Sequence, residues 1–465
     1  MTDTLRSAFA SDAVSRHFDD ASLIAAMARF EAALALAEAD AGIVPADAAR
    51  AIAAVCARAA DGARAGGAFD PARLAADARR AGTLAIPFVK ALTAEVARED
   101  ADAARWVHWG ATSQDAIDTA LALQTVAAGA ALSALIGRTG DALVALADAH
   151  RHTATVGRTL LQPAVPVTFG WKAAGWLSPL VRGRAALRRA LDDAAALQLG
   201  GAGGTRAALG GRGDAVAAAT AARLGLADPA GSWHGARDRV ARLGAELALV
   251  AGAMAKIGRD VSLLMQAEVA EAFEPDGDGR GGSSAMPHKR NPVGAMLALQ
   301  AGLRAPGLAA TLLAQQAGEH ERGLGGWQAD WWTLGALFEC AGSAAEAIAE
   351  VVEGLRVDAA AMARNLEATR GFVFAEAVTV ALAGRVGKAA AHRAMEAVCA
   401  EAIDRGVPLR RALDDARDRD AALAAALPVD ALDALFDAAR QRGDADAMLD
   451  RTIAAWRAGT DGREA

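Results

Sequence analysis

Residues 240–264 read VARLGAELALVAGAMAKIGRDVSLL, and this stretch decides the fold. Its large apolar residues are separated alternately by three and four positions. They are Val240, Leu243, Leu247, Val250, Met254, Ile257, Val261 and Leu264. Such an alternation is typical of the seam along which a helix packs in a coiled-coil-like bundle. We therefore expect a long bundle helix in this stretch.

Four more stretches predict long helices, because apolar residues recur in them at helical spacing between capping and breaking residues. They cover 112–150, the residues after Pro166 to about 199, 292–318 and 327–355. Five helices longer than the usual mean of about 11–12 residues imply a bundle tall enough to span several subunit layers. Alanine-rich helices with apolar residues on more than one face usually need partners, so an oligomer is favoured over a monomeric bundle.

Shorter helices are predicted on both sides of the bundle, and no stretch alternates as a strand would. Residues 22–40 have helical spacing and end at Gly42, whereas residues 86–88, Ile-Pro-Phe, are expected to break the pattern before a helix from Val89. The predicted fold class is all-α with three helical domains. These are an N-terminal domain over 1–105, a central long-helix bundle over 106–355 and a C-terminal domain over 356–465.

Composition limits the partners and the compartment. The net charge of −7 and the pI of about 5.7 argue against nucleic acid as the main partner. The N-terminus lacks a signal-peptide pattern, and no run approaches the roughly 18 consecutive apolar residues of a membrane span. Three scattered cysteines are too few for a disulfide framework, so we expect a cytoplasmic protein without a membrane partner.

Five histidines lack metal-ligand spacing to acids or cysteines and are interpreted as structural or surface residues. They are His17, His150, His152, His234 and His392. No metal is therefore expected.

The segment 279–291, GRGGSSAMPHKRN, combines backbone freedom, positive charge and a helix start. Five of the seven residues 277–283 are Gly or Ser, so this part has little to bury. Three cationic residues, 288–290, precede Asn291 and Pro292, which are typical of the N-cap and first position of a helix. Their charges add to the positive end of the helix dipole. The segment therefore predicts a site for a small polyanion under a closing loop.

Eleven consecutive residues of this segment, GSSAMPHKRNP over 282–292, resemble the signature loop of the fumarase/aspartase superfamily. Its form is similar to that of adenylosuccinate lyases and bacterial 3-carboxy-cis,cis-muconate cycloisomerases. The resemblance implies that Ser283, as an oxyanion, removes the proton next to a substrate carboxylate. It also implies that Lys289 and Asn291 stabilise the aci-carboxylate that forms, and that Ser284 binds substrate. An isolated Gly/Ser segment would be a solvated linker, and GGSSA is not the elbow of a nucleophilic serine.

A second motif, WVHWGATSQD over 106–115, resembles a His-aromatic-Gly-x-Thr-Ser-x-Asp motif of the same two families. From the residues alone, Thr112 and Asp115 have capping-box spacing at a helix start, with Asp in place of the usual Glu. A helix N-terminus with Thr and Ser hydroxyl groups is also an anion site. The resemblance implies that Thr112 and Ser113 bind a substrate carboxylate, with His108 also at the site.

A third motif, GRTLLQPAVPVTFGWK over 157–172, resembles the cycloisomerase version of a segment that adenylosuccinate lyases share. Those lyases have the histidine taken as their general acid where this chain has Leu160. Because leucine cannot transfer a proton, this difference counts against an adenylosuccinate type of cleavage. Arg158 and Gln162 have an alternative interpretation as solvated residues that flank a helix, and we favour a place near the substrate.

The segment His320-Glu321-Arg322 resembles a superfamily segment whose arginine reaches an acid group of the substrate. Arg322 is therefore expected to clamp a carboxylate. The tryptophan-rich run 327–332 is more typical of a core or an interface than of a cofactor platform. The glycines of 198–205 follow a predicted helix and not a strand, which argues against a dinucleotide site and favours a turn that lines the substrate. No cofactor is expected.

The resemblance implies the reversible lactonisation of a tricarboxylate, 3-carboxy-cis,cis-muconate, to 4-carboxymuconolactone in the protocatechuate branch of the β-ketoadipate pathway. In the superfamily each active site is assembled from three subunits of a homotetramer. Two alternatives stay open. One is a lyase that releases fumarate from an adenylosuccinate- or argininosuccinate-like substrate. The other is a catalytically silent scaffold, against which the intact set of Ser283, Lys289 and Asn291 argues.

Overall fold

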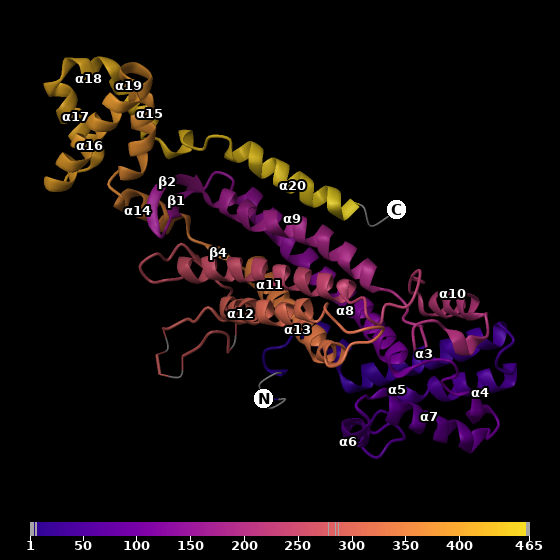
Figure 1. Ribbon diagram of the computed structural model, residues 1–465. Coiled ribbons are helices and arrows are strands. Elements are labelled where there is room, and N and C mark those ends of the chain that lie inside the picture. The colour runs from indigo at the N-terminus through magenta and orange to yellow at the C-terminus, as the bar shows by residue number, and fades with distance from the viewer. Residues whose placement is uncertain (1–3, 5–6, 278, 284, 287, 462–465) are drawn as a thin grey trace. The chain divides into compact units, whose positions relative to one another are not determined.

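Five long helices dominate the fold, which is all-α as predicted (Figure 1). The computed structural model describes residues 4, 7–277, 279–283, 285–286 and 288–461. The long helices are α8 (Ser113–Ala149), α9 (Phe169–Ala194), α11 (Asp238–Leu264), α12 (Val293–Ala314) and α13 (Gly326–Glu353).

The chain divides into two compact units, and each long helix contributes residues to both. The first unit comprises 1–136, 183–255 and 297–346, and the second comprises 137–182, 256–296 and 347–465. The division into three domains at residues 105 and 355 stays a prediction.

The seam of α11 is buried along its whole length. None of its eight large apolar residues is more than 7 % exposed, so the predicted bundle helix is confirmed. A Cβ on Gly244 would lie 2.4 Å from a methyl of Leu312 on α12 and 3.3 Å from a methyl of Leu337 on α13. A Cβ on Gly302 of α12 would lie 2.5 Å from the Cβ of Ala255. These spacings are shorter than packed carbon atoms adopt, so glycine is what lets the three helices approach so closely.

The N-terminal part consists of shorter helices, all within the first unit. They are α2 (Asp12–Ser15), α3 (Asp20–Asp40), α4 (Ala46–Cys56), α5 (Ala59–Gly62), α6 (Pro71–Ala81) and α7 (Ala85–Glu99), joined later in the chain by α10 (Gly213–Leu224). α3 packs against α4 and α10 and buries Phe30 and Leu34. The predicted break at residues 86–88 is wrong, because Pro87 lies in the first turn of α7, where a helix does not need the missing N–H.

The second unit contains a β-hairpin, which corrects the expectation that the chain has no strand. Strands β1 (Ala154–Thr159) and β2 (Gln162–Thr168) pair antiparallel, with Thr159 opposite Gln162. Pro163 and Pro166 give β2 the composition of a loop, but a two-stranded ribbon has free edges where proline needs no hydrogen-bond partner. Because β2 continues to residue 168, α9 begins at Phe169 and not directly after Pro166. A second pair joins β3 (Ala272–Phe273) to β4 (Arg356–Val357).

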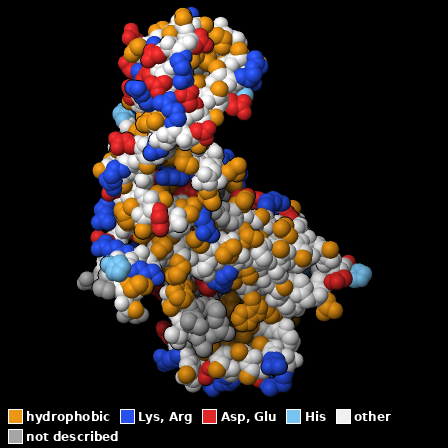
Figure 2. Space-filling view, turned by 90° about the vertical axis from the view of Figure 1, so that its left-hand side faces the viewer, with side chains coloured by type: hydrophobic (Ala, Val, Ile, Leu, Met, Phe, Trp, Pro, Cys, Tyr) orange, Lys and Arg blue, Asp and Glu red, His pale blue; other side chains and the backbone are white. Residues whose placement is uncertain are grey.

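The C-terminal part of the second unit is a series of shorter helices, as predicted. They are α14 (Ala359–Ala368), α15 (Ala375–Val386), α16 (Lys388–Asp404), α17 (Leu409–Arg419), α18 (Ala421–Ala426), α19 (Val429–Leu435) and α20 (Ala445–Asp461). Helices α15 to α19 share a core that includes Leu382, Met395 and Leu413. Their surface mixes both signs of charge, as Figure 2 shows, and Arg405 pairs there with Glu401 at 2.6 Å.

Among the described residues, two helices are long and apolar enough to cross a membrane by length and composition alone. The most apolar window of α8 has a mean hydropathy of 1.7, and that of α12 has 1.3. The window of α8 is 67 % buried within the chain, as in the core helix of a soluble protein, whereas that of α12 is only 28 % buried. On α12, Leu303 is 80 % exposed and Leu313 is 49 % exposed. An apolar helix face of this kind is typical of a contact with another chain.

Candidate active site

The start of α8 brings together two of the predicted residues from distant parts of the sequence. Nη1 of Arg322 donates to Oγ1 of Thr112 at 3.2 Å, although 210 positions separate the two residues. Nη2 of Arg322 donates to the carbonyl oxygens of Gly201 and Ala202, at 3.3 and 3.1 Å. The predicted turn of 198–205 therefore lies beside the same arginine. Ser113 is the first residue of α8 and is half-buried.

Asp115 holds this arrangement together, although sequence reasoning gave it only a capping role. Its carboxylate accepts the backbone N–H of Thr112 at 3.0 Å, which is half of the predicted capping box. It also accepts the N–H groups of Gly200 and Gly201, both at 2.9 Å. His234 completes the set, with Nε2 at 2.7 Å from Asp115 Oδ1. His234 is thus structural, as predicted, and the sequence gave no sign that it would pair with a residue 119 positions away.

One turn further along α8, a buried ion network fixes the helix against α13. Arg237 lies between Asp118 at 2.7 Å and Asp330 at 2.6 Å, and all three side chains are at most 4 % exposed. Nε1 of Trp327 donates to Asp118 at 3.0 Å, so this residue of the tryptophan-rich run is structural. Burial raises the pKa of Asp330 to about 7, although Arg237 acts in the opposite direction. Networks of this kind give the neighbouring site a defined geometry.

His108 lies in the turn before α8 and is held by a partner that sequence reasoning missed. Its Nδ1 is 2.6 Å from Oε1 of Glu31, on α3. The His108 side chain is 17 % exposed, and that of Glu31 is 1 % exposed. Glu31 lies in the apolar pattern of α3 with no local feature that marks it, so only the tertiary structure reveals the pair.

In the second unit, two backbone N–H groups of the loop face the hydroxyl oxygen of Ser283. Its Oγ accepts the backbone N–H of Met286 at 3.1 Å and faces that of Ala285 at 3.4 Å. Two N–H groups aimed at one hydroxyl oxygen favour its deprotonated form. Ser284, the other serine of the signature, lies outside the described residues.

The base of the signature loop is closed by backbone contacts. Asn291 donates its N–H to the carbonyl oxygen of Gly281 at 2.8 Å, and its amide Nδ2 lies 3.4 Å from the carbonyl oxygen of Gly282. A Cβ on Gly281 would lie 2.5 Å from the carbonyl oxygen of Asn291, and its φ is +67°, so glycine is required there. Lys289 is exposed, and its ammonium group has no partner among the residues that the structure describes. Arg290, by contrast, pairs with Asp276.

The helix start after the loop differs from the prediction. α12 begins at Val293, one residue later than predicted, and among the described contacts the Asn291 side chain binds Gly282 and not the first N–H groups of the helix. The carboxylate of Glu274, which is 6 % exposed, accepts the N–H groups of Gly294 at 3.0 Å and Ala295 at 2.8 Å. These two N–H groups therefore bind a carboxylate of their own chain and not a substrate anion, and the predicted polyanion site at the loop and its cationic residues stays a prediction. Since Glu274 lies about 20 positions upstream, no local pattern indicates the contact.

The hairpin contains Arg158 and Gln162. Arg158 binds the buried Glu271 with both terminal nitrogens, at 2.9 and 2.7 Å. Burial raises the pKa of Glu271, but hydrogen bonds from Arg158 and Asn365 outweigh this, so the net shift is downward. The Arg158 side chain is 26 % exposed, and Gln162 is exposed at the start of β2.

The tip of this hairpin has an unusual sequence. Leu160 and Leu161 have φ values of +51° and +65°, a conformation that Asn and Gly usually supply in two-residue turns. They are 97 % and 74 % exposed. The tip contains no histidine, which is the residue taken as the general acid of adenylosuccinate lyases at this place.

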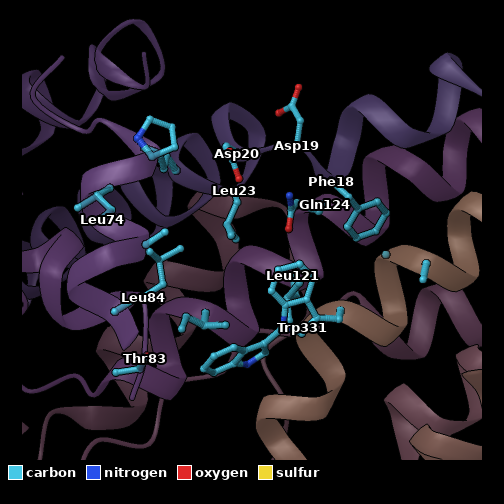
Figure 3. A pocket seen from close by; sticks show the side chains of 18 of the residues that line it. Phe18, Asp19, Asp20, Leu23, Leu74, Thr83, Leu84, Leu121, Gln124 and Trp331 are labelled. Atoms are coloured by element: carbon cyan, nitrogen blue, oxygen red, sulfur yellow. The ribbon is translucent and has the colours of Figure 1, made fainter. Parts of the chain in front are cut away.

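The predicted residues thus form two groups. The first unit holds His108, Thr112, Ser113 and Arg322, and the second unit holds Arg158, Gln162, Ser283, Lys289 and Asn291. A cavity of about 680 Å³ in the first unit contains none of them. It is largely apolar, and Figure 3 shows Leu23, Leu121 and Trp331 around it.

Comparisons with known proteins agree on one family. A family model described as lyase matches residues 2–307, and one described as adenylosuccinate lyase C-terminus matches residues 371–452. The 3-carboxy-cis,cis-muconate cycloisomerase of Bradyrhizobium diazoefficiens is 50 % identical over 94 % of both chains. The enzyme of that name from Pseudomonas aeruginosa is 47 % identical over 94 % of this chain and 93 % of its own.

A solved structure supports the same grouping. The 3-carboxy-cis,cis-muconate lactonizing enzyme from Pseudomonas putida superposes with a TM-score of 0.90 at 42 % identity. The match covers 99 % of this chain and 100 % of that one.

Proposed function

The chain belongs to the fumarase/aspartase superfamily of lyases, in its family of 3-carboxy-cis,cis-muconate cycloisomerases, and we propose that it interconverts 3-carboxy-cis,cis-muconate and 4-carboxymuconolactone. The observation that carries this proposal is the pair of N–H groups at Ser283 Oγ, within a loop that also presents the ammonium of Lys289, which has no partner among the described residues. A base and a cation at one loop fit the removal of a proton next to a carboxylate.

The reaction is simplest to follow from the lactone. Ser283, as an oxyanion, takes the proton from the carbon next to a carboxylate, and the electron pair moves into that carboxylate to give the aci form. Lys289 and Asn291 stabilise the added charge. The electron pair then returns, a C=C bond forms and the ring C–O bond breaks, which releases the third carboxylate. In the lactonising direction the attacking carboxylate is tethered, so correct orientation supplies much of the rate.

The leaving group explains why Leu160 is compatible with this reaction. A carboxylate leaves as a stable anion, since its conjugate acid has a pKa of about 4, and needs no proton from an acid. An amine leaving group, as in an adenylosuccinate type of cleavage, needs that proton. Leu160 therefore favours the lactone over the fumarate-releasing alternative.

The carboxylates of the substrate have candidate partners in both groups of residues. Arg322 and Thr112 already face each other at 3.2 Å, and Ser113 lies at the positive end of the α8 dipole. Arg158 and Gln162 extend the second group. We assign all of these residues, with His108 and Ser284, to substrate binding.

A homotetramer with active sites shared between subunits, located in the cytoplasm, completes the proposal. The exposed apolar residues of α12, among them Leu303 and Leu313, support a subunit contact. In this arrangement the first group of one subunit and the second groups of its neighbours bind one substrate molecule.

The test is a pair of assays on the purified protein. We expect loss of the 3-carboxymuconate absorbance with formation of the lactone, and no fumarate release from adenylosuccinate or argininosuccinate. Fumarate release without lactonisation would favour the lyase alternative, and no turnover in either assay would favour the scaffold.

A further inference from the structure

The backbone conformation of His108 and the arrangement of its two ring nitrogens indicate that the Glu31–His108 pair is more than a packing contact between α3 and the turn before α8. His108 has a φ of +60°, an uncommon conformation for a residue other than glycine. Its Nδ1 lies 2.6 Å from Glu31 Oε1, whereas its Nε2 has no partner among the described residues. When a carboxylate holds one ring nitrogen, the orientation of the other nitrogen is fixed as well.

The charges around the pair favour an imidazolium. Oε2 of Glu31 is buried with no hydrogen-bond partner among the described residues, so His108 is the only group bound to this carboxylate. A buried carboxylate is stable as an anion only when it is paired. Burial lowers the pKa of His108, but the charge and hydrogen bond of Glu31, with the charge of Asp115, outweigh this and raise it overall.

Glu38, the other buried carboxyl group on this part of α3, favours its neutral form and adds no further negative charge beside Glu31. It lies two turns after Glu31 on α3, is fully buried and has no partner for either oxygen among the described residues. Burial, and then the charge of Glu31, raise the pKa of Glu38 to about 9. A Cβ on Gly110 would lie 3.7 Å from Glu38 Oε1, so Glu38 also borders the turn that contains His108. The raised pKa values therefore favour a protonated His108 and a neutral Glu38 beside the carboxylate of Glu31.

We propose that Glu31 is a positioning residue that keeps His108 as an imidazolium, whose Nε2–H binds a substrate carboxylate beside Thr112 and Arg322. This deepens the proposed function and depends on it, because the ligand is a carboxylate of the proposed tricarboxylate. No proton is transferred in this role. His108 adds a positive charge to a site where Asp115 and its N–H donors already fix the geometry.

The proposal has a consequence for pH dependence. With Glu31 in place, His108 keeps its charge across neutral pH, and binding of the substrate needs no proton uptake. Without Glu31, burial outweighs the remaining charge of Asp115 and lowers the pKa of His108, so the cation is lost as the pH rises through the neutral range. The groups that face His108 are Glu31 and Asp115, and Asp115 remains bound to His234.

The test compares Glu31→Gln with the parent in KM and kcat between pH 6 and 8. We expect a flat KM in the parent and a KM that rises about tenfold or more in Glu31→Gln, with a smaller change in kcat. Glu31→Asp keeps the charge and should restore the flat profile. His108→Gln is the matched control, and its KM should be raised equally at all pH values. A flat KM near the parent value in Glu31→Gln would overturn the proposal.

Nitrogen NMR on histidine-labelled parent protein gives a readout that needs neither turnover nor a variant. We expect the His108 ring in the imidazolium form at pH 7.5, with Nε2 shifting when propane-1,2,3-tricarboxylate is added. A neutral His108 ring, or no shift at a saturating concentration of this tricarboxylate, would contradict the role. If the parent does not lactonise 3-carboxymuconate but shows both NMR results, the proposed substrate fails while the Glu31–His108 site stands.

Discussion

The two groups of candidate residues differ in how the fold holds them. Around the start of α8, the fully buried Asp115 binds three N–H groups and His234, and Arg322 already binds Thr112. The described residues of the signature loop contain no such centre, and the backbone contact between Gly281 and Asn291 closes its base. From this contrast we propose that the first group is a preformed carboxylate receptor. We also propose that the loop of the second group gains further partners when an anionic substrate binds.

The largest effect should come from the loop. Ser283→Ala removes the proposed base, and we expect kcat to fall by about 10²–10⁴-fold while KM changes little, because the receptor is untouched. Steady-state kinetics measure both. Ser262→Ala, which removes an exposed hydroxyl on α11 that donates to a backbone carbonyl, is the control and should keep full turnover. An active Ser283→Ala protein would remove the loop from the mechanism.

The free energy of unfolding should depend strongly on pH because of Glu38, which borders the turn that contains His108. Its folded-state pKa of about 9 lies above the ordinary value of 4.5, so the folded state binds this proton more tightly. The resulting stability is complete below pH 4.5 and is lost as the pH rises towards 9. We expect a loss of about 1.4 kcal/mol in the free energy of unfolding per pH unit within this window.

Urea unfolding at pH 5, 6, 7 and 8 measures this loss. Glu38→Gln should flatten the profile, whereas Glu99→Gln, at an exposed pair with Arg58, should leave it unchanged. Equal slopes for the parent and Glu38→Gln would show that Glu38 titrates normally.

Arg322→Ala should affect binding more than chemistry. It removes the donor to Thr112 and a charge for one carboxylate, so we expect KM to rise about 30-fold, or about 2 kcal/mol, with a smaller change in kcat. Arg419→Ala removes an exposed pair with Glu401 and is the control, with no expected change in KM. A fall in kcat alone would place Arg322 in the chemical step and weaken the contrast between receptor and loop.

The smallest effect is expected at Glu274, whose carboxylate holds the start of α12 directly after the loop. Glu274→Ala removes the carboxylate that caps α12, and we expect the free energy of unfolding to fall by about 1 kcal/mol, with a moderate loss of kcat. Asp420→Ala is the matched control, since Asp420 also accepts two N–H groups, at the start of α18. It should lose similar stability and no activity. Unchanged kinetics in Glu274→Ala would show that the loop does not depend on this anchor.

Local patterns in the sequence predicted a large part of the fold. The alternating seam of 240–264 became α11, and the cap at Thr112 set the start of α8 within one residue. The hairpin of 154–168 was missed because prolines and a glycine give it the composition of a loop. The ribbon becomes visible only through the pairs between its two strands, for example Val156 with Pro166.

The candidate residues themselves came from motifs, but their partners did not. Glu31, Glu271 and Glu274 act on the site through contacts that span 77, 113 and 20 positions. No sequence pattern near these residues indicates their contacts, because the role of a buried carboxylate depends on the groups that the fold places around it. For this reason the prediction that Asn291 caps α12 was wrong, since the carboxylate of Glu274 binds the first N–H groups of that helix.

Subunit complementation tests most directly whether receptor and loop build one active site. The purified Ser283→Ala and Arg322→Ala proteins are mixed, their subunits are exchanged under mild denaturation and reassembled, and native mass spectrometry confirms hybrid oligomers. Because the account places the two residues in different subunits of each site, some hybrid sites carry both intact residues. Lactonisation should then rise well above that of either variant alone. Verified hybrids with no recovered activity would contradict the account.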